Sequence, residues 1–556
     1  MAKKTTEPKQ PKENKQKVVK QKSLEDILFD CRNSLRGRAQ MSDKRDLLLT
    51  LVFLKFIYDR FLKQQEKIKA DLAERLQGDP NPGMIEMMLN RPAAYAQDGV
   101  FFLTDETRWD KLILSEPKLM AVNFDNAIAL LENIETGKDS KGNPQRPLRN
   151  ALPQQIFTKT ALEPSVLKEV VDNVNQISSE RFAGADLIGR VYEYFLQAFS
   201  INQDKEEGEF YTPHSIVQLI AELIEPYNGT LYDPCCGSGG MFIQSMRLVE
   251  AHGGNTKQVN IYGQESEPAT YRLAKMNLAV RGMSYDLGDK AASTFTDDQH
   301  KDKSKFGGGF DFIMANPPFN LKRWGGEKLT SDDRWKGYGV PPASNANYGW
   351  ILHILDKLKP MSGRAGFLLA NGALDDGDAK EIRKQLIEND KVEAIIVLPR
   401  EMFYSTDISV TLWILNNNKR GGVDKNSGKR LRNRQHEVLF MDLRTWNTNI
   451  YEKKYVMFTD EQIAEVKRIY NDWQTKETDG QYAQPELYYS ATLNELKEKD
   501  YSLVPSRYIE FVDRDTELDY KTVLSQSEET IADLLKRQAT NAEKLQNALK
   551  LLGYGN

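Results

Sequence analysis

The residues Asn316, Pro317, Pro318 and Phe319 combine an amide, two prolines and an aromatic ring directly after the apolar run 310–315. Each proline fixes its own φ and has no N–H, so this corner is rigid. The oxygens of the Asn316 amide and the Pro317 carbonyl can each accept one N–H from an amine on an aromatic ring. Those two bonds would turn the nitrogen lone pair outward, toward an electrophilic carbon. An ordinary proline turn is the alternative for so short a motif.

Phe319 offers a flat face on which a planar base can stack, a contact worth about 1–3 kcal/mol. A base inside a duplex must flip out to reach such a pocket. The segment 321–339 that follows mixes basic and aromatic residues, namely Lys322, Arg323, Trp324, Arg334, Trp335 and Lys336. We expect this segment to hold DNA backbone around a flipped base. A solvated loop is the alternative.

A glycine-rich turn, "DPCCGSGG", follows the strand candidate 230–233 and precedes a helical stretch. Asp233 ends the strand, and Gly237, Ser238 and Gly239 lie in the turn. Glycines let the backbone approach a ligand closely, and the N-terminus of the next helix faces the same space. The pattern is typical of a nucleotide cradle, although a plain tight corner produces the same letters.

Two acids follow the next strand candidates. Glu265 comes directly after 259–264, where a carboxylate can accept both hydroxyls of a ribose. Asp289, in "LGD", can accept a hydrogen bond from an adenine amino group. Either acid alone could be a solvated loop charge, but both follow consecutive strands of one predicted sheet.

A parallel sheet is needed to bring these residues together. Between about Gln203 and Asn418, short apolar runs alternate with helical stretches, which indicates βαβ units. The expected strands are 230–233, 259–264, 310–315, 365–370, 392–398 and 410–415. Ligands of such sheets bind at the carboxyl ends of the strands, where the candidates lie.

The rest of the chain divides into regions of different composition. We expect a disordered basic tail over 1–23, an all-α domain over 24–200, the sheet domain over 201–480 and a helical segment over 481–556. The last segment has a seam spaced alternately by four and three residues, as in a coiled coil. The seam consists of Ile531, Leu535, Gln538, Ala542, Leu545, Leu549 and Leu552. Such a helix either packs on its own domain or docks on another chain.

Composition excludes several classes of function. The net charge of −4 argues against a protein that coats nucleic acid by charge alone. Three cysteines and five histidines without metal-ligand spacing predict no metal site. The segment 421–430 departs from the Walker A pattern at both ends, so we expect a polar hairpin tip and no ATP hydrolysis. No membrane span or apolar signal core is apparent, which predicts a cytoplasmic location.

Four motifs together, "GEFYTP" (208–213), "DPCCGSGG", "GQESE" and "NPPFN", resemble the S-adenosylmethionine-dependent N6-adenine DNA methyltransferases. Their order resembles the branch that contains the modification subunits of type I restriction-modification systems. The resemblance extends over most of the chain, through the segments 35–61, 344–374, 392–403 and 500–510. It implies an α/β fold: a Rossmann-like methyltransferase sheet with an all-α N-terminal domain and a helical or coiled-coil C-terminal tail.

The resemblance also implies roles for individual residues. The methionine end of S-adenosylmethionine would be held by Asp233, Gly237 and Gly239, and lined by Phe210, Tyr211 and Thr212. Glu265 would bind the ribose and Asp289 the adenine ring of the cofactor. Asn316, Pro317 and Phe319 would hold the target adenine.

The implied reaction is site-specific N6-adenine methylation of double-stranded DNA. No pair of recognition modules is apparent after Lys419, so we expect another polypeptide to read the sequence. The resemblance implies two partners. One is a specificity subunit, which would bind two copies of this chain, and the other is a motor-nuclease subunit that carries out restriction. Two alternatives are methylation of a protein glutamine amide and a non-catalytic scaffold that binds the cofactor.

Overall fold

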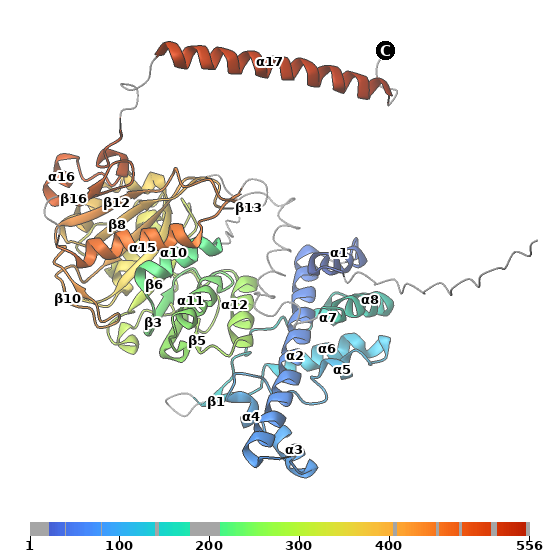
Figure 1. Ribbon diagram of the computed structural model, residues 1–556. Helices are drawn as coiled ribbons and strands as arrows, with labels where there is room; N and C mark the ends of the chain where they lie inside the picture. The colour runs from blue at the N-terminus through green and yellow to red at the C-terminus, as the bar shows by residue number, and fades with distance from the viewer. Residues whose placement is uncertain are drawn as a thin grey trace, which may run out of the picture.

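The computed structural model describes residues 22–38, 40–78, 80–138, 144–177, 212–403, 408–451, 455–477, 481–512 and 520–551. A helical domain lies beside a larger domain built on a sheet, and one long C-terminal helix stands apart from both (Figure 1). Residues 1–21 of the expected basic tail, and the segment 178–211 with Phe210 and Tyr211, lie outside the described residues. No helix within the described ranges is long and apolar enough to cross a membrane.

The N-terminal domain is helical, as predicted. Its helices are α1 (Leu24–Ser34), α2 (Met41–Leu76), α3 (Pro82–Leu89), α4 (Ala93–Ala96), α5 (Trp109–Leu112), α6 (Pro117–Leu131), α7 (Ile156–Lys159) and α8 (Pro164–Asn175), with a small hairpin of β1 (Gly137–Lys138) and β2 (Pro144–Gln145). The side chain of Ser23 accepts from the Asp26 N–H, and the Asp26 carboxylate accepts from the Ser23 N–H, so a capping box starts α1. The apolar stripe of α2 packs with α1, α6 and α8 in one core.

Ten strands form the main sheet, in the order β15-β16-β12-β8-β9-β7-β6-β3-β4-β5. They are β3 (Gly229–Asp233), β4 (Val259–Gly263), β5 (Tyr285–Asp286), β6 (Phe312–Ala315), β7 (Arg364–Ala370), β8 (Val392–Val397), β9 (Val410–Asn416), β12 (Glu437–Asp442), β15 (Ala483–Gln484) and β16 (Tyr488–Thr492). Each of the six predicted strands is confirmed within two residues at either end. The neighbours β5, β4, β3, β6 and β7 run parallel, whereas β9 is antiparallel to both β7 and β8.

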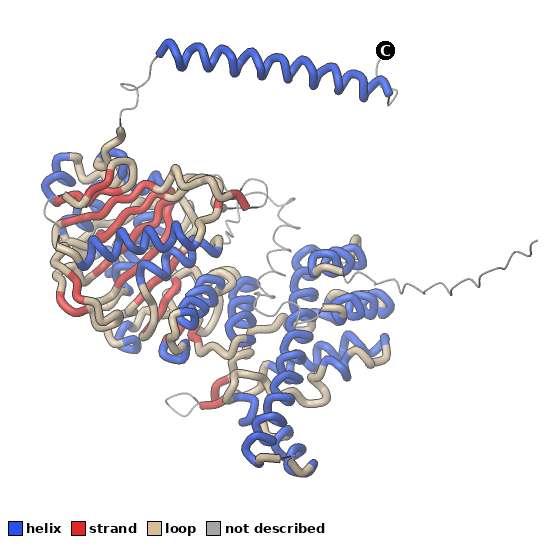
Figure 2. The backbone as a smooth tube through the Cα atoms, in the orientation of Figure 1, coloured by secondary structure: helices blue, strands red, loops and turns tan. Residues whose placement is uncertain are grey.

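Helices cover both faces of this sheet, which gives three layers (Figure 2). One face carries α10 (His214–Ile224), α11 (Gly240–Ala251), α12 (Pro268–Val280) and α15 (Asp460–Thr475). The other face carries α13 (Asn347–Lys357), α14 (Lys380–Glu388) and α16 (Leu493–Glu498). Successive strand residues alternate between the two cores, as the pleat requires: Phe312 packs on the first face and Ile313 on the second. The predicted methyltransferase-type α/β fold is confirmed.

Two segments after β9 bear on the expected boundaries. The antiparallel strands β10 (Gly422–Val423) and β11 (Arg430–Leu431) pair across residues 422–431, so the predicted hairpin is confirmed. A second hairpin joins β13 (Ile450–Tyr451) and β14 (Tyr455–Val456). The boundary expected at residue 480 needs correction, because β16 pairs with β12 from Glu437↔Thr492 to Met441↔Tyr488. The sheet domain therefore extends at least to α16.

The helix α17 (Tyr520–Leu551) carries the predicted seam. Its side chains Leu524, Ile531, Leu534, Leu535 and Leu545 are each at least 57% exposed. The helix lies away from the sheet domain, so the alternative in which it packs on its own domain does not fit (Figures 1 and 2). A single helix does not make a coiled coil, and Leu552 lies outside the described residues.

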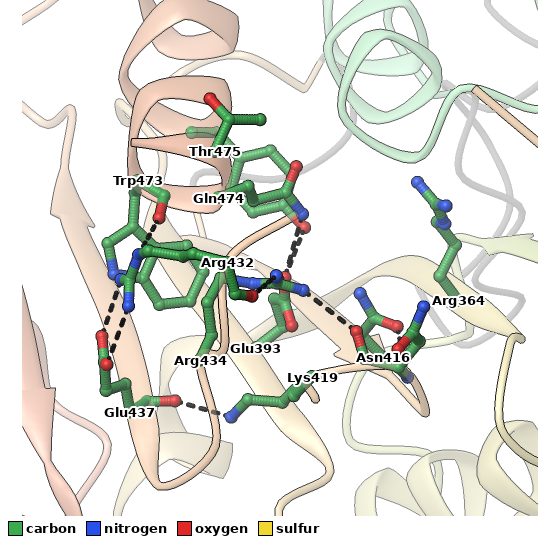
Figure 3. Close-up of polar contacts among 12 residues, drawn as sticks. Arg364, Glu393, Asn416, Lys419, Arg432, Arg434, Glu437, Trp473, Gln474 and Thr475 are labelled. Atoms are coloured by element: carbon green, nitrogen blue, oxygen red, sulfur yellow. Dashed lines mark hydrogen bonds and ion pairs between the residues drawn. The ribbon is translucent and has the colours of Figure 1, made fainter. Parts of the chain in front are cut away.

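A buried network of charges attaches the last part of the sheet domain to its centre (Figure 3). Glu393 of β8 and Arg434 before β12 are both fully buried, and Nε of Arg434 donates to Oε1 of Glu393 at 3.2 Å. Gln474 of α15 donates to the same oxygen at 2.9 Å. Lys419 is also buried and donates to the carbonyl oxygens of Val392 and Glu437. The network thus joins β8, β12 and α15.

The helix α12 connects the two domains. Its residues Leu273, Met276 and Ala279 belong to the core of the helical domain, while others on its opposite side pack under the sheet. After α12, the backbones of Gly282 and Gly99 touch: a Cβ on Gly282 would lie 2.7 Å from the Gly99 Cα. The helical domain is therefore packed against the edge of the sheet that carries β4 and β5.

Candidate active site

Four neighbouring strands end at one edge of the sheet, and a candidate residue lies at or just after the end of each of them. Asp233 ends β3, opposite Gly263 of β4, and Asn316 comes directly after β6, whose Ile313 is opposite Tyr232. Glu265 lies just beyond β4, and Asp289 just beyond β5. The sheet topology therefore gathers the predicted residues along its carboxyl edge.

The glycine turn has the shape of a ligand cradle. Gly237 and Gly239 have φ of +53° and +78°, the left-handed region that glycine adopts without strain. Gly239 is also the N-cap of α11. A Cβ built on Gly237 would meet no atom within 4 Å, so open space lies in front of this turn. The Ser238 carbonyl accepts from Nδ2 of Asn277 at 2.9 Å, which ties the turn to α12.

Asp233 is 1% exposed, and its Oδ1 accepts from the Cys235 N–H at 3.0 Å. Burial raises the pKa of Asp233 to about 7, and the nearby charge of Glu265 adds to the rise. A buried carboxyl group beside an open turn can be compensated by a cation. The arrangement therefore fits the positively charged methionine end of S-adenosylmethionine.

Glu265 and Asp289 differ in their surroundings. Glu265 is half-buried: Oε2 accepts from the Gly237 N–H at 3.0 Å, and Oε1 from the Glu267 N–H at 2.8 Å. Its carboxylate is thus fixed beside the glycine turn. Asp289 is exposed and lines a cavity of about 480 Å³ whose other walls include Arg149 and Lys275. Asp289 therefore lies at a cavity between the sheet domain and the helical domain.

The corner after β6 is pinned on both sides. Nδ2 of Asn316 donates to Oγ1 of Thr212 at 2.9 Å, and Oδ1 of Asn316 is buried without a partner among the described residues. After the corner, Asn320 and the buried Asn347 exchange two hydrogen bonds of 3.1 and 2.9 Å. A buried oxygen without a donor costs about 1–3 kcal/mol, so Oδ1 is ready to accept an incoming N–H.

Phe319 has an aromatic neighbour that sequence reasoning missed. Phe403 lies edge-on to it, with ring centroids 6.0 Å apart and an interplanar angle of 87°. Phe403 lies a few residues after β8, in the segment 392–403. This segment resembles the methyltransferase family, but no site residue was selected from it on the basis of sequence. Its place after a sheet strand was the available signal.

The segment 321–339 corrects two predictions. Trp324 is 5% exposed and packs on Phe295, and Arg334 bonds within the protein through each of its nitrogens. Two of these bonds go to the carbonyl oxygens of Thr294 and Phe295, at 3.0 and 2.6 Å. Neither Trp324 nor Arg334 is placed to contact a DNA backbone. Lys322, Arg323 and Lys336 are exposed.

The fold and this carboxyl edge define an S-adenosylmethionine-dependent methyltransferase. The chain belongs to the N-6 DNA methylase family, whose profile matches residues 183–517. The profile of the HsdM N-terminal domain matches residues 24–174, which covers the helical domain.

Named relatives agree with this assignment. The chain is 41% identical over 377 residues to the type I restriction enzyme HindI methylase subunit of Haemophilus influenzae, covering 66% of this chain and 79% of that protein. It is 30% identical over 547 residues to the type I restriction enzyme MjaIX methylase subunit of Methanocaldococcus jannaschii, covering 96% of this chain and 92% of that protein. The fold resembles the type I restriction-modification methyltransferase subunit of Streptococcus thermophilus, with a TM-score of 0.66 at 22% identity over 88% of this chain and 99% of that one.

Proposed function

We propose that this chain is the modification subunit of a type I restriction-modification system and methylates N6 of adenine in double-stranded DNA. The observation that carries the proposal is the Oδ1 atom of Asn316, which is buried without a partner among the residues that the structure describes, at the carboxyl edge of an N-6 DNA methylase fold. Protein glutamine methylation is not favoured, because the family profile that matches residues 183–517 is that of the N-6 DNA methylases, and the relative that aligns with 96% of this chain is a type I restriction enzyme methylase subunit. We also propose that the protein is located in the cytoplasm, where a DNA-modifying subunit would meet its substrate.

The proposed mechanism assigns a task to each side chain. Asp233 and the glycine turn would hold the methionine end of the cofactor, Glu265 its ribose and Asp289 its adenine. When bound, S-adenosylmethionine supplies an electrophilic methyl carbon. Oδ1 of Asn316 and the Pro317 carbonyl accept the two N–H groups of the target amine and free its lone pair, while the rigid corner keeps both acceptors aligned. Phe319 stacks on the flipped base.

Transfer of a labelled methyl group tests the proposed function. The chain, alone and with a co-purified specificity subunit, is incubated with tritiated S-adenosylmethionine and unmethylated DNA. We expect label in DNA, recovered as N6-methyladenine after nuclease digestion, and more of it with the partner. Label on protein would support glutamine methylation instead, and no label in either fraction with the partner present would leave only a scaffold.

Asp233 makes cofactor affinity depend on pH. Because its raised pKa lies near 7, Asp233 is protonated in more acidic solution, and the positive cofactor pairs best with its ionised form. Affinity should therefore rise with pH by up to about tenfold per unit and level off above about pH 7. The folding stability of the ligand-free protein should change with pH in the opposite direction. The stabilisation that the neutral Asp233 carboxyl group contributes is complete below its ordinary pKa of 3.8 and is lost as the pH rises through its folded-state pKa of about 7.

Calorimetric titration with S-adenosylmethionine, in two buffers of different ionisation enthalpy, detects the proton released by Asp233 on binding. Asp233→Asn removes this group without removing its hydrogen-bonding shape. The variant should bind without the pH slope that the wild-type protein shows. An equal slope in both proteins would contradict the assignment.

The exposed seam of α17 is our candidate contact with the specificity subunit. Its residues Leu524, Leu534, Leu535 and Leu545 are each at least 57% exposed, so we expect that removal of residues 520–556 uncovers none of the buried cores. We expect the truncated chain to keep its melting temperature and its cofactor affinity, and to lose the specificity subunit in co-purification. Replacing Leu535 and Leu545 together by Ser in the full chain is the matched test. If the truncated chain still co-purifies with that subunit, the contact lies elsewhere.

Two copies of this chain for each specificity subunit, and a motor-nuclease subunit in the restriction complex, complete the proposed assembly. The mass of the purified complex gives the stoichiometry directly.

A further inference from the structure

Asn320, directly after the corner, contacts two other asparagines whose amide orientations are fixed by the backbone. A backbone N–H can only donate, so the amide atom that it contacts must be the oxygen. The Asn320 N–H donates to Oδ1 of Asn347 at 3.1 Å, which turns Nδ2 of Asn347 toward the Asn320 side chain. In the same way, the Asn347 N–H donates to Oδ1 of Asn345 at 2.9 Å, which turns Nδ2 of Asn345 toward Asn320.

The two NH₂ groups meet at one atom of the Asn320 amide. Nδ2 of Asn347 lies 2.9 Å from this atom, and Nδ2 of Asn345 lies 3.2 Å from it. Because two donors need an acceptor, the atom is Oδ1 of Asn320, and the NH₂ group of Asn320 must point the other way. Asn320 is exposed, and its Nδ2 has no partner within the described part of the chain. Asn320 therefore presents a donor of fixed orientation to solvent.

The backbone around Asn320 is also held in an uncommon conformation. Its φ of +53° lies in the left-handed region, which asparagine tolerates better than most residues. The carbonyl oxygen of Leu321 accepts from the Ala346 N–H at 3.0 Å, so the chain after the corner runs beside the start of α13. Asn347 itself is 1% exposed. Such conformations persist where the surroundings enforce them, and they are frequent at ligand-binding sites.

The surroundings of Asn320 favour a negatively charged ligand. Lys322 and Arg323 are exposed two and three residues further along the chain. The helix α13 begins at Asn347, so the partial positive charge of its N-terminus lies beside Asn320. Asn320 also directly follows Phe319, on which the flipped base would stack, and neighbouring Cα atoms are about 3.8 Å apart. A flipped base keeps the phosphates of its own nucleotide beside it, and asparagine side chains commonly donate to DNA phosphates.

We propose that Nδ2 of Asn320 donates to a phosphate oxygen of the target strand beside the flipped adenine. Asn345 and Asn347 set the orientation of the Asn320 amide for this contact. The inference deepens the proposed function and rests on it. It gives the two asparagines of the corner different tasks, because Asn316 would bind the target amine and Asn320 the backbone that carries it.

Two substitutions of Asn320 test the donor. Asn320→Asp keeps an oxygen that accepts from Asn345 and Asn347, but it replaces the donor by a negatively charged acceptor. Asn320→Gly removes the donor without adding charge, and glycine adopts the same φ. In the complex with the specificity subunit, we expect Asn320→Gly to weaken binding of duplex DNA by about 10- to 100-fold, and Asn320→Asp to weaken it more. Cofactor affinity, measured by calorimetry, should stay within threefold of the wild-type value.

A matched control separates this contact from net charge. Asn389→Asp makes the same change at an exposed asparagine at the end of α14 and should bind DNA like the wild-type protein. A loss of DNA affinity in Asn389→Asp equal to that in Asn320→Asp, with no loss in Asn320→Gly, would overturn the inference.

A phosphate scan identifies the acceptor. Each phosphate next to the target adenine is replaced in turn by a neutral methylphosphonate. At one position the replacement should weaken binding by the wild-type protein and leave binding by Asn320→Gly unchanged. At that same position it should strengthen binding by Asn320→Asp, because the repulsion between two negative charges is removed. A purely structural role of Asn320 would produce no such coupling to a single phosphate.

Failure of the inference can be told from failure of the proposed function. If the wild-type protein with its partner methylates no DNA, the proposed function fails. If it methylates DNA while both Asn320 variants bind DNA within threefold of the wild-type protein, Asn320 does not contact DNA. Weaker binding by the variants that no single methylphosphonate modifies would also overturn the phosphate contact, as would coupling to 7-deazaadenine at the target position instead. Melting temperatures check that each variant folds.

Discussion

Asn316→Ala is expected to reduce kcat for methyl transfer to adenine by about 10²–10³-fold or more, the usual effect of deleting one aligned hydrogen-bonding group that stabilises the transition state. The reason is local. Oδ1 of Asn316 is the buried acceptor at the carboxyl end of β6, and its loss leaves the amine conjugated with its ring. Single-turnover transfer of tritium to DNA measures the effect.

The cofactor residues do not depend on this amide. Asp233 and Glu265 are held by the backbone N–H groups of Cys235 and Gly237, so cofactor affinity should persist in Asn316→Ala. Asn389→Ala, an exposed asparagine at the end of α14, is the matched control and should transfer at the wild-type rate. Transfer by Asn316→Ala within threefold of the wild-type rate would remove Asn316 from the reaction and favour another acceptor at this edge.

The parallel strands explain why so much of the site could be predicted. The strands β3, β4 and β6 are short apolar runs, and the carboxyl ends of parallel strands must meet at one edge. Position after such a run was therefore enough to select Asp233, Glu265 and Asn316, whereas Asp289 follows β5, a two-residue strand that was not among the predicted ones. The two left-handed glycines follow from the same logic, since the chain must turn sharply from β3 into α11.

Residues whose role depends on distant contacts could not be predicted. The basic and aromatic residues that follow Asn316–Phe319 predicted a DNA-binding surface. Arg334 instead donates to backbone carbonyl oxygens 39 and 40 residues away in the sequence, and these bonds hold its side chain inside the protein. Burial decides between the two outcomes, and local composition does not encode it. The bond between Thr212 and Asn316 was hidden for the same reason.

The far edge of the sheet was missed because its pairing is also non-local. The strand β16, "YYSAT", has no apolar alternation of its own and is specified by its register with β12. The run 437–442 is apolar, but it lies after the hairpin 421–430 and outside the region 203–418 in which strands were expected. Tertiary pairing and the buried charges of Figure 3 together keep this edge in place.

Arg434→Met should destabilise the protein by about 3–5 kcal/mol, the largest stability effect that we expect from one side chain. Glu393 and Arg434 are both fully buried, and the substitution leaves the Glu393 carboxylate without its main counter-charge. The double variant Glu393→Met, Arg434→Met removes both charges and should lose less stability than Arg434→Met alone. Arg468→Met, on the same helix as Gln474 but in an ion pair with exposed fractions of 55% and 39%, should cost at most about 1 kcal/mol.

The pH dependence identifies the cause. Burial alone would raise the pKa of Glu393, but the charges of Arg434 and Lys419 and the hydrogen bonds from Gln474 and Arg434 hold it below its ordinary value of 4.5. The stabilisation is therefore complete above that value and is lost as pH falls through the depressed pKa. Without Arg434, burial dominates and Glu393 takes up a proton more readily. The difference in unfolding free energy between the wild-type protein and Arg434→Met should thus narrow as pH falls from neutral, and denaturant unfolding at several pH values measures it. If the difference in unfolding free energy stays constant with pH, Arg434 stabilises the fold through packing on Trp473 and not through the charge of Glu393. The Cζ atom of Arg434 lies 5.8 Å from the centroid of the Trp473 ring.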